Sequence, residues 1–275
     1  MSNNINPSRF FSRLSRTLLS RQAVTIYWIV NLTLFIGLLM WVGMDGKFSQ
    51  AARLLSHVAP WDKSDLQIVT LPPMLSTRVY LLNALVIAGF ISAVGIVCAL
   101  FFGAGSTRSL RAWLAVMFVM AAWLTFYTTW PDYAWRAQAW RVSRSLPALE
   151  LLARTLLDDW PSQDGQHPAI GPFNAYPIGS PRTLMLLTKP HLSGSNLRIS
   201  TIERGDGRDL YFQLTGSDEG ATLARITGRN QPHAYYSGLE GGYQPFRSHA
   251  LGKNWFLVQY LYAPIVDGGG ASSAR

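Results

Sequence analysis

Three long stretches without a charged residue constrain this chain more than any other feature of its sequence. They cover residues 23–43, 79–102 and 112–130, and each is close to the ~20 apolar residues that a helix needs to cross a bilayer. Charged residues make up only 14% of the chain, against ~25% in typical soluble domains. The sequence therefore predicts an integral membrane protein with three α-helical transmembrane spans.

The segments around these spans differ from them in charge and in turn-forming residues. Residues 1–22 are basic and carry apolar residues at near-helical spacing, which is typical of a helix lying in the membrane interface. The other predicted segments are the loop 44–78, the short basic loop 103–111, the Trp/Arg-rich juxtamembrane segment and helix 131–161, the small α+β domain 162–264 and the flexible tail 265–275. This division predicts a membrane anchor followed by one folded domain.

The segment after the third apolar run, TTWPDYAWRAQAWRVSRSLP, combines tryptophan with arginine. Trp rings favour the headgroup level of a bilayer, and Arg side chains extend from the acyl boundary to lipid phosphates. We therefore expect membrane-interface anchors at Trp130, Trp135, Arg136, Trp140, Arg141 and Arg144, and in the N-terminal segment at Arg9, Arg13, Arg16 and Arg21. The alternative is a partner-binding surface, because Trp and Arg are also frequent hot-spot residues. Pro131 predicts a helix break between the span and this segment.

Residues 147–161 predict a helix packed on a core, because leucines recur along one face. The stripe comprises Leu149, Leu152, Leu156 and Leu157. Strand patterns follow at 183–189, 197–204, 208–216, 222–227 and 255–262. The stretch 162–182 is rich in Pro and Gly, and we expect no regular element there. One helix followed by about five strands predicts a C-terminal α+β domain with a mostly antiparallel sheet.

The sequence contains no motif for a nucleophile elbow, a phosphate-binding loop or a metalloprotease helix. The single cysteine, Cys98, excludes a cysteine-based zinc site. Histidines of the C-terminal domain are His167, His191, His233 and His249. A metal site built on His233 and His249 needs a third ligand, with Glu240 or Asp206 as the candidate. No spacing enforces that arrangement, so we expect no catalytic residue, no cofactor and no metal.

The expected function is that of a non-catalytic membrane-anchored subunit, scaffold or sensor. Such a protein presents the α+β domain on one side of the membrane and binds protein partners. The spans lack the ionisable side chains that mark ion or proton pathways, which argues against a transporter acting alone. The alternative is a membrane-anchored hydrolase or metal-dependent enzyme that uses histidines of the C-terminal domain.

The chain has a formal net charge of +9, and the positions of its basic residues indicate which partners and which location to expect. The arginines flank the apolar runs or are scattered, so we expect the lipid bilayer with its anionic headgroups as the partner and no nucleic acid. The basic cluster before the first span predicts a cytoplasmic N-terminus and an extracytoplasmic C-terminal domain in the cell (inner) membrane. The alternative is the mitochondrial inner membrane, because residues 1–22 are Arg-rich, Ser-rich and free of acids.

Overall fold

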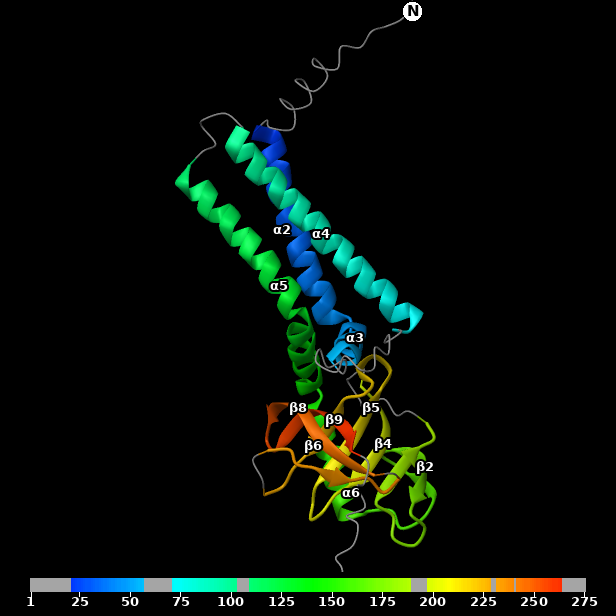
Figure 1. The fold of residues 1–275 in the computed structure, drawn as a ribbon. Coiled ribbons are helices and arrows are strands. Elements are labelled where there is room, and N and C mark those ends of the chain that lie inside the picture. The colour runs from blue at the N-terminus through cyan, green and yellow to red at the C-terminus, as the bar shows by residue number, and fades with distance from the viewer. Residues whose placement is uncertain are drawn as a thin grey trace, which may run out of the picture. The chain divides into compact units, whose positions relative to one another are not determined.

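The computed structural model of the chain describes residues 21–56, 71–102, 109–188, 197–228, 231–239 and 241–263 (Figure 1). The chain divides into two compact units, Met1–Ala134 and Trp135–Arg275, and each is described by itself. Nearly all of the predicted interfacial segment, most of the loop 103–111 and the whole predicted tail lie outside the described residues.

Helices make up the described part of the first unit. They are α2 (Arg21–Met44), α3 (Lys47–Ser56), α4 (Pro73–Phe102) and α5 (Leu110–Ser143), the last of which continues into the second unit. Three of them are long and apolar enough to cross a membrane, over Val24–Met44, Pro73–Phe101 and Leu110–Ser143. This confirms the prediction of three apolar helices, and it suggests a membrane location for the protein.

Aromatic side chains form much of the core of the helical unit. Trp123 of α5 is fully buried, and its ring meets that of Phe35 of α2 edge-on at a centroid distance of 5.3 Å. Gly89 of α4 makes room for this indole, because a Cβ at that position would collide with it. Outward-facing side chains such as Ile91 and Met117 are large, apolar and exposed, as expected of helices surrounded by lipid.

Helix α5 does not end at Pro131, in contrast to the predicted break. The helix continues to Ser143 with the proline inside it. Proline removes only one helical hydrogen bond, and contacts with neighbouring helices hold such positions in shape. One of these contacts lies two residues later, where the Tyr133 hydroxyl donates to the Leu39 carbonyl of α2 at 3.1 Å.

The second unit consists of an antiparallel sheet and helix α6 (Leu146–Asp158). The strands are β1 (Gly165–His167), β2 (Gly171–Tyr176), β3 (Thr183–Leu186), β4 (Arg198–Arg204), β5 (Leu210–Thr215), β6 (Thr222–Arg225), β7 (Tyr235–Tyr236), β8 (Gly242–Gly252) and β9 (Trp255–Ala263). They form one nine-stranded sheet in the order β1-β2-β3-β4-β5-β6-β9-β8-β7, and each neighbouring pair is antiparallel. The helix-then-sheet architecture predicted from the sequence is therefore present.

The prediction of about five strands is wrong, because the sheet has nine. The additional strands are β1, β2, β7 and β8. Strands β1 and β2 lie in the Pro/Gly-rich stretch, where Gly171 with φ 78° begins the second strand. Strand β8 contains Pro245 beside a register shift in its pairing with β9, a place where a strand accommodates proline. Such strands depend on pairing with their neighbours more than on their own sequence pattern.

The two faces of the sheet are packed differently. On the first face, Leu149 and Leu156 of α6 share a core with Phe212 of β5 and Trp255 of β9. On the second face, Tyr211, the residue before Phe212, belongs to a smaller core rich in tyrosine. Successive side chains of a strand point to opposite faces, so one sheet supplies two chemically different environments.

Candidate binding site

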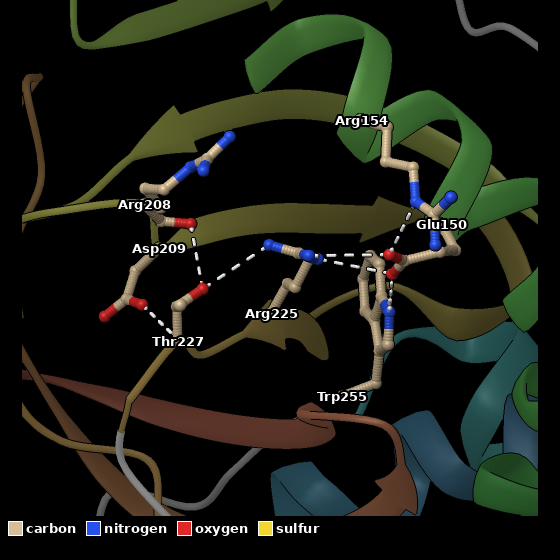
Figure 2. A network of polar contacts seen from close by, with 7 residues as sticks. All are labelled: Glu150, Arg154, Arg208, Asp209, Arg225, Thr227 and Trp255. Atoms are coloured by element: carbon tan, nitrogen blue, oxygen red, sulfur yellow. Dashed lines mark hydrogen bonds and ion pairs between the residues drawn. The ribbon is translucent and has the colours of Figure 1, made fainter. Parts of the chain in front are cut away.

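Glu150 of α6 is the centre of a polar network that joins the helix to the sheet (Figure 2). Its Oε2 accepts hydrogen bonds from Trp255 Nε1 at 2.9 Å and from Arg225 Nε at 3.2 Å. Its Oε1 accepts from Arg154 Nε at 3.1 Å and from Arg225 Nη2 at 3.4 Å. Both carboxylate oxygens are thus bonded to donors that come from α6, β6 and β9.

The donors around Glu150 determine its ionisation. Burial raises the pKa of this carboxyl, but the hydrogen bonds from Arg225, Trp255 and Arg154, with the charge of Arg225, outweigh burial and lower the pKa to about 2. The carboxylate therefore stays ionised at neutral pH and does not act as a proton donor. Its role is to fix α6 on the first face of the sheet.

The network continues beyond Arg225 along the ends of β5 and β6 (Figure 2). Arg225 Nη1 donates to Thr227 Oγ1 at 3.4 Å, and the Thr227 backbone N–H donates to Asp209 Oδ1 at 2.6 Å. Asp209 Oδ2 in turn lies 3.6 Å from His233 Nε2. Side chains of both faces are thereby connected through one chain of polar contacts.

A hollow with a volume of about 680 Å³ lies beside Glu150. The lining residues are Ser143, Leu146, Pro147, Glu150, Leu151, Arg154, Leu251, Gly252, Lys253 and Trp255. Leucine, proline and tryptophan side chains supply its apolar walls, and Leu151 is largely exposed. The volume lies within the ~300–1,000 Å³ range of typical ligand sites. The hollow is therefore large enough to receive a side chain or a small ligand.

Basic side chains leave the rim of the hollow positively charged. Arg225 neutralises Glu150 from the side of the sheet, so the charges of Arg154 and Lys253 remain at the rim. Lys253 (φ 50°) and Asn254 (φ 66°) form the turn between β8 and β9 in the left-handed conformation of a tight hairpin. The hairpin turn thus fixes the backbone position of Lys253 at the rim.

An exposed Trp/Arg pair lies at the end of α5, within three residues of Ser143 in the chain. Trp140 is 56% exposed, and the guanidinium carbon of Arg144 lies 3.6 Å from the centre of its ring. Ser143, the residue before Arg144, lines the hollow. We call Trp140, Arg144 and the residues that line the hollow the α5–α6 surface.

The structure places the three tryptophans of the predicted anchor segment in different surroundings. Trp130 is 8% exposed and belongs to the core of the helical unit. Trp135 is 7% exposed and belongs to the core of the sheet unit, with the Arg247 guanidinium carbon 5.2 Å from its ring centre. Of the three rings, Trp140 alone is mostly exposed. The position of all three relative to a bilayer stays a prediction.

The arginines of the predicted anchor set also differ from one another. Arg141 Nη2 lies 3.4 Å from Asp218 Oδ1, whereas Arg136 and Arg144 are exposed. Arg21 is the first residue of α2. Arg9, Arg13 and Arg16 lie outside the described residues. Contact of these side chains with lipid headgroups remains an expectation from the sequence.

A second carboxyl group, that of Glu203 on β4, lies on the tyrosine-rich face of the sheet. Glu203 is only 2% exposed. Gln213 Nε2 of β5 donates to its Oε1 at 2.7 Å, whereas its Oε2 has no hydrogen-bond partner in the described part of the chain. Burial raises the pKa of Glu203 to about 7, although hydrogen bonds from Ser237 and Gln213 act in the opposite direction.

Tyrosine rings cover the same face beside Glu203. They are Tyr211, Tyr235, Tyr243 and Tyr260. Tyr235 stacks on Tyr211 at a ring-centroid distance of 3.8 Å and on Tyr243 at 5.3 Å. Burial and the charge of Glu203 raise the pKa of Tyr235, and burial raises that of Tyr260. These two hydroxyls are therefore neutral at physiological pH, and neither supplies a positive charge beside Glu203.

The described histidines do not gather into a metal site. Within residues 21–263, leaving out the undescribed gaps, no three His, Cys, Asp or Glu side chains are placed to hold a metal ion. His233 lies instead beside Asp209 and at 3.5 Å from the Tyr211 hydroxyl. His249 belongs to β8, and His167 to β1. Two of the residues considered from the sequence, His191 and Glu240, lie outside the described ranges.

Sequence reasoning missed both Glu150 and Glu203. The partners of Glu150 on the sheet, Arg225 and Trp255, follow it by 75 and 105 residues, so no local pattern signals the network. Glu203 stands near the end of a predicted strand, where a charged residue is ordinary. Its lack of a cationic partner became apparent only from the folded arrangement.

Comparisons with known proteins leave the site to be interpreted from its own geometry. No protein-family model matches the chain, and no match was found among the curated proteins or the solved structures.

Proposed function

We propose that this protein is a non-catalytic, membrane-anchored subunit or scaffold that binds a protein partner through the α5–α6 surface. The three apolar helices support the anchoring part of the proposal. The observation that carries the binding part is an exposed Trp140–Arg144 pair beside an apolar hollow. Interface hot spots are enriched in Trp and Arg and cluster around pockets that exclude water.

The charge of the α5–α6 surface supports a partner segment that is both apolar and acidic. Leu151 and Leu146 present apolar surface to the hollow, and Arg154 and Lys253 line it with positive charge. The exposed Arg144 follows the lining residue Ser143 and adds a third cation to the α5–α6 surface. The negative charge of Glu150 is already satisfied by its own partners. Complementary charge steers a partner towards such a surface and excludes basic competitors.

Polar contacts inside the helical unit support an anchoring role over a transport role. Asn31 of α2 is buried, and its Oδ1 accepts a hydrogen bond from Trp123 Nε1 at 2.9 Å. Its Nδ2 donates to Ser92 Oγ at 2.7 Å and to the Tyr27 carbonyl at 3.1 Å. This amide therefore ties α2, α4 and α5 together, as polar side chains commonly do between membrane helices.

We further propose the orientation that follows from the basic N-terminal segment. The N-terminus then lies in the cytoplasm, and the sheet unit lies outside it, in the cell inner membrane. The mitochondrial inner membrane is the alternative location. Reporter fusions at the two ends of the chain test this directly, because an odd number of spans requires the ends to report opposite sides.

Site-directed cross-linking in intact membranes tests the binding proposal. A photoreactive residue at position 151 should give a discrete cross-linked protein product, and the same residue at position 178 should not. Ile178 is a suitable control because it is 96% exposed and does not line the hollow. The product should fade when Arg154 and Lys253 are both changed to Glu. Identical products from positions 151 and 178 would refute the proposal.

An enzymatic role is the second candidate, and one observation favours it. His233 lies between Asp209 and Tyr211, an arrangement that resembles the partners of a general base. Elemental analysis of the purified protein distinguishes a metal-dependent enzyme from a binding subunit. A stoichiometric transition metal that is lost in His233→Ala would favour the enzyme, and its absence from a fully folded preparation would favour the binding subunit.

A further inference from the structure

Two buried oxygen atoms without hydrogen-bond partners lie on neighbouring strands of the tyrosine-rich face. Thr183 of β3 and Glu203 of β4 are Cα partners across the antiparallel pair. Among the described residues, neither Thr183 Oγ1 nor Glu203 Oε2 has a hydrogen-bond partner. A buried oxygen without a partner costs free energy, and the cost is far larger for a charged oxygen than for a neutral one.

A short segment of chain covers these two side chains. We call Tyr235–Gly238 the strap; it comprises β7 and the two residues that follow. A Cβ at Gly238 would collide with Thr183 Oγ1, so the strap backbone lies directly on that hydroxyl. The Ser237 hydroxyl is bonded to Glu203, and the Tyr235 ring stacks on Tyr211.

The backbone attachment of the strap to the sheet is slight. Strand β7 pairs with β8 over only two residues, Tyr235 with Tyr243 and Tyr236 with Gly242. One further backbone bond runs from the Ser237 N–H to the Gly241 carbonyl at 3.1 Å. Short edge strands of this kind open more readily than the centre of a sheet.

We propose that Glu203 and the strap form a pH-sensitive latch, in which the strap is closed over a neutral Glu203 and opens when that carboxyl is ionised. Beneath the closed strap no described group is bonded to Oε2, and the hydrogen bonds from Ser237 and Gln213 to the carboxyl do not outweigh its burial. Opening admits water that solvates an ionised Oε2. Because burial raises the pKa of Glu203 to about 7, the transition falls close to physiological pH.

The surroundings of Glu203 favour its neutral form. The titratable side chains that face it or lie on the same face are Tyr211 on β5, Tyr235 on the strap, Tyr243 on β8, Tyr260 on β9, and Asp209 with His233 at the edge. No arginine or lysine forms an ion pair with Glu203 in the described ranges. His233 Nε2 lies 3.6 Å from Asp209 Oδ2 and, among the described residues, forms no ion pair with Glu203.

Hydrogen exchange of the full-length protein in mild detergent tests the latch. Protection factors, corrected for the intrinsic effect of pH on exchange, are measured for the strap amides. They should fall by up to about tenfold for each pH unit between the ordinary glutamate pKa of 4.5 and about 7, and then level off. Amides of α6 serve as an internal control and should not follow this profile.

Two variants decide whether Glu203 is responsible. Glu203→Gln imitates the neutral carboxyl and should keep the strap protected across the whole pH range. Gln213→Met removes a donor that lowers the pKa of Glu203, so the loss of protection should extend to higher pH. A flat wild-type profile would overturn the latch, as would an unchanged profile in Glu203→Gln. If Glu203→Gln does not fold, the direction of the change in Gln213→Met decides the matter.

Discussion

Glu150 and Glu203 belong to one folded unit, yet their chemical states are opposite. Burial acts on both carboxyl groups in the same direction, towards a higher pKa. Glu150 receives hydrogen bonds from two guanidinium groups and an indole, and its pKa falls to about 2. Glu203 has no bonded cation among the described residues, and its pKa rises to about 7. Glu203 is also the deeper of the two, at 2% exposed against 23% for the Glu150 side chain. The charge of the donors and the depth of burial therefore separate the two sites together.

The contrast assigns different roles to the two faces of the sheet. Glu150 is permanently charged and holds α6, so the α5–α6 surface keeps its shape when pH changes. Glu203 changes its charge near neutral pH, so the strap above it responds to pH. The proposed binding surface and the proposed latch thus occupy one small unit without sharing side chains.

The largest expected effect comes from breaking the Glu150 network. Glu150→Gln leaves the half-buried Arg225 guanidinium without its counter-charge. The lowering of the Glu150 pKa from 4.5 to about 2 corresponds to a loss of about 3.5 kcal/mol in the free energy of unfolding. Thermal or denaturant unfolding of the protein in mild detergent measures this loss. A change of the size expected for an exposed ion pair would show that the network contributes little to stability.

The pH dependence of stability should have opposite signs at the two carboxyl groups. Glu150 contributes stability that is present above pH 4.5 and is lost as pH falls towards 2. The contribution of Glu203 is present below pH 4.5 and is lost as pH rises through 7. Glu203→Gln should therefore raise the free energy of unfolding by about 3 kcal/mol at about pH 8, with no gain at about pH 4.5. Equal effects at both pH values would contradict the assignment.

A smaller effect is expected from removing a single donor to Glu150. Trp255→Phe keeps the aromatic packing but loses the Nε1–H bond to a charged acceptor, at a cost of about 2 kcal/mol. Trp160→Phe is a matched control, because its Nε1 donates to the neutral Pro181 carbonyl at 2.8 Å, and we expect about 1 kcal/mol there. If both variants lost the same free energy of unfolding, the charge of the Glu150 acceptor would not strengthen the Trp255 hydrogen bond.

The smallest effect on stability is expected at Arg154. Its ion pair with Glu150 spans one helical turn on a largely exposed side chain, and Arg154→Gln should cost no more than about 0.5 kcal/mol. The same variant should nevertheless weaken cross-linking of the partner through position 151. Cross-linking at the wild-type level would exclude Arg154 from the binding surface, and a large loss of stability would make it part of the structural network.

The three long apolar helices and the order of helix and sheet could be predicted because their signals are local. A run of apolar residues long enough to cross a bilayer needs no partner elsewhere in the chain to be recognised. The leucine stripe of α6 and the alternation in β5 also depend on neighbours a few residues away. Strands β1 and β2 were missed for the opposite reason. Their Pro- and Gly-rich sequence carries no local strand pattern, and their strand conformation depends on pairing with neighbouring strands.

The Trp/Arg segment shows where local chemistry is insufficient. Trp130, Trp135 and Trp140 have the same amphipathic side chain at equal spacing, but the fold buries the first two in separate cores and exposes the third. Pro131 predicts a break from its own covalent structure, but α5 continues through it. A preference of one residue is worth only a few kcal/mol, and packing contacts of the surrounding helices exceed it.

The sequence alone specified where apolar helices run and which later segments alternate as strands, because both patterns are written in consecutive residues. Tertiary structure alone decided that Glu150 meets Arg225 and Trp255, and that Glu203 meets no cation among the described residues. The ionisation of a carboxyl group depends on the charges and donors within a few ångströms of it. Residues far apart in the chain supply those groups, so the chemistry of this protein arises only after the strands have paired.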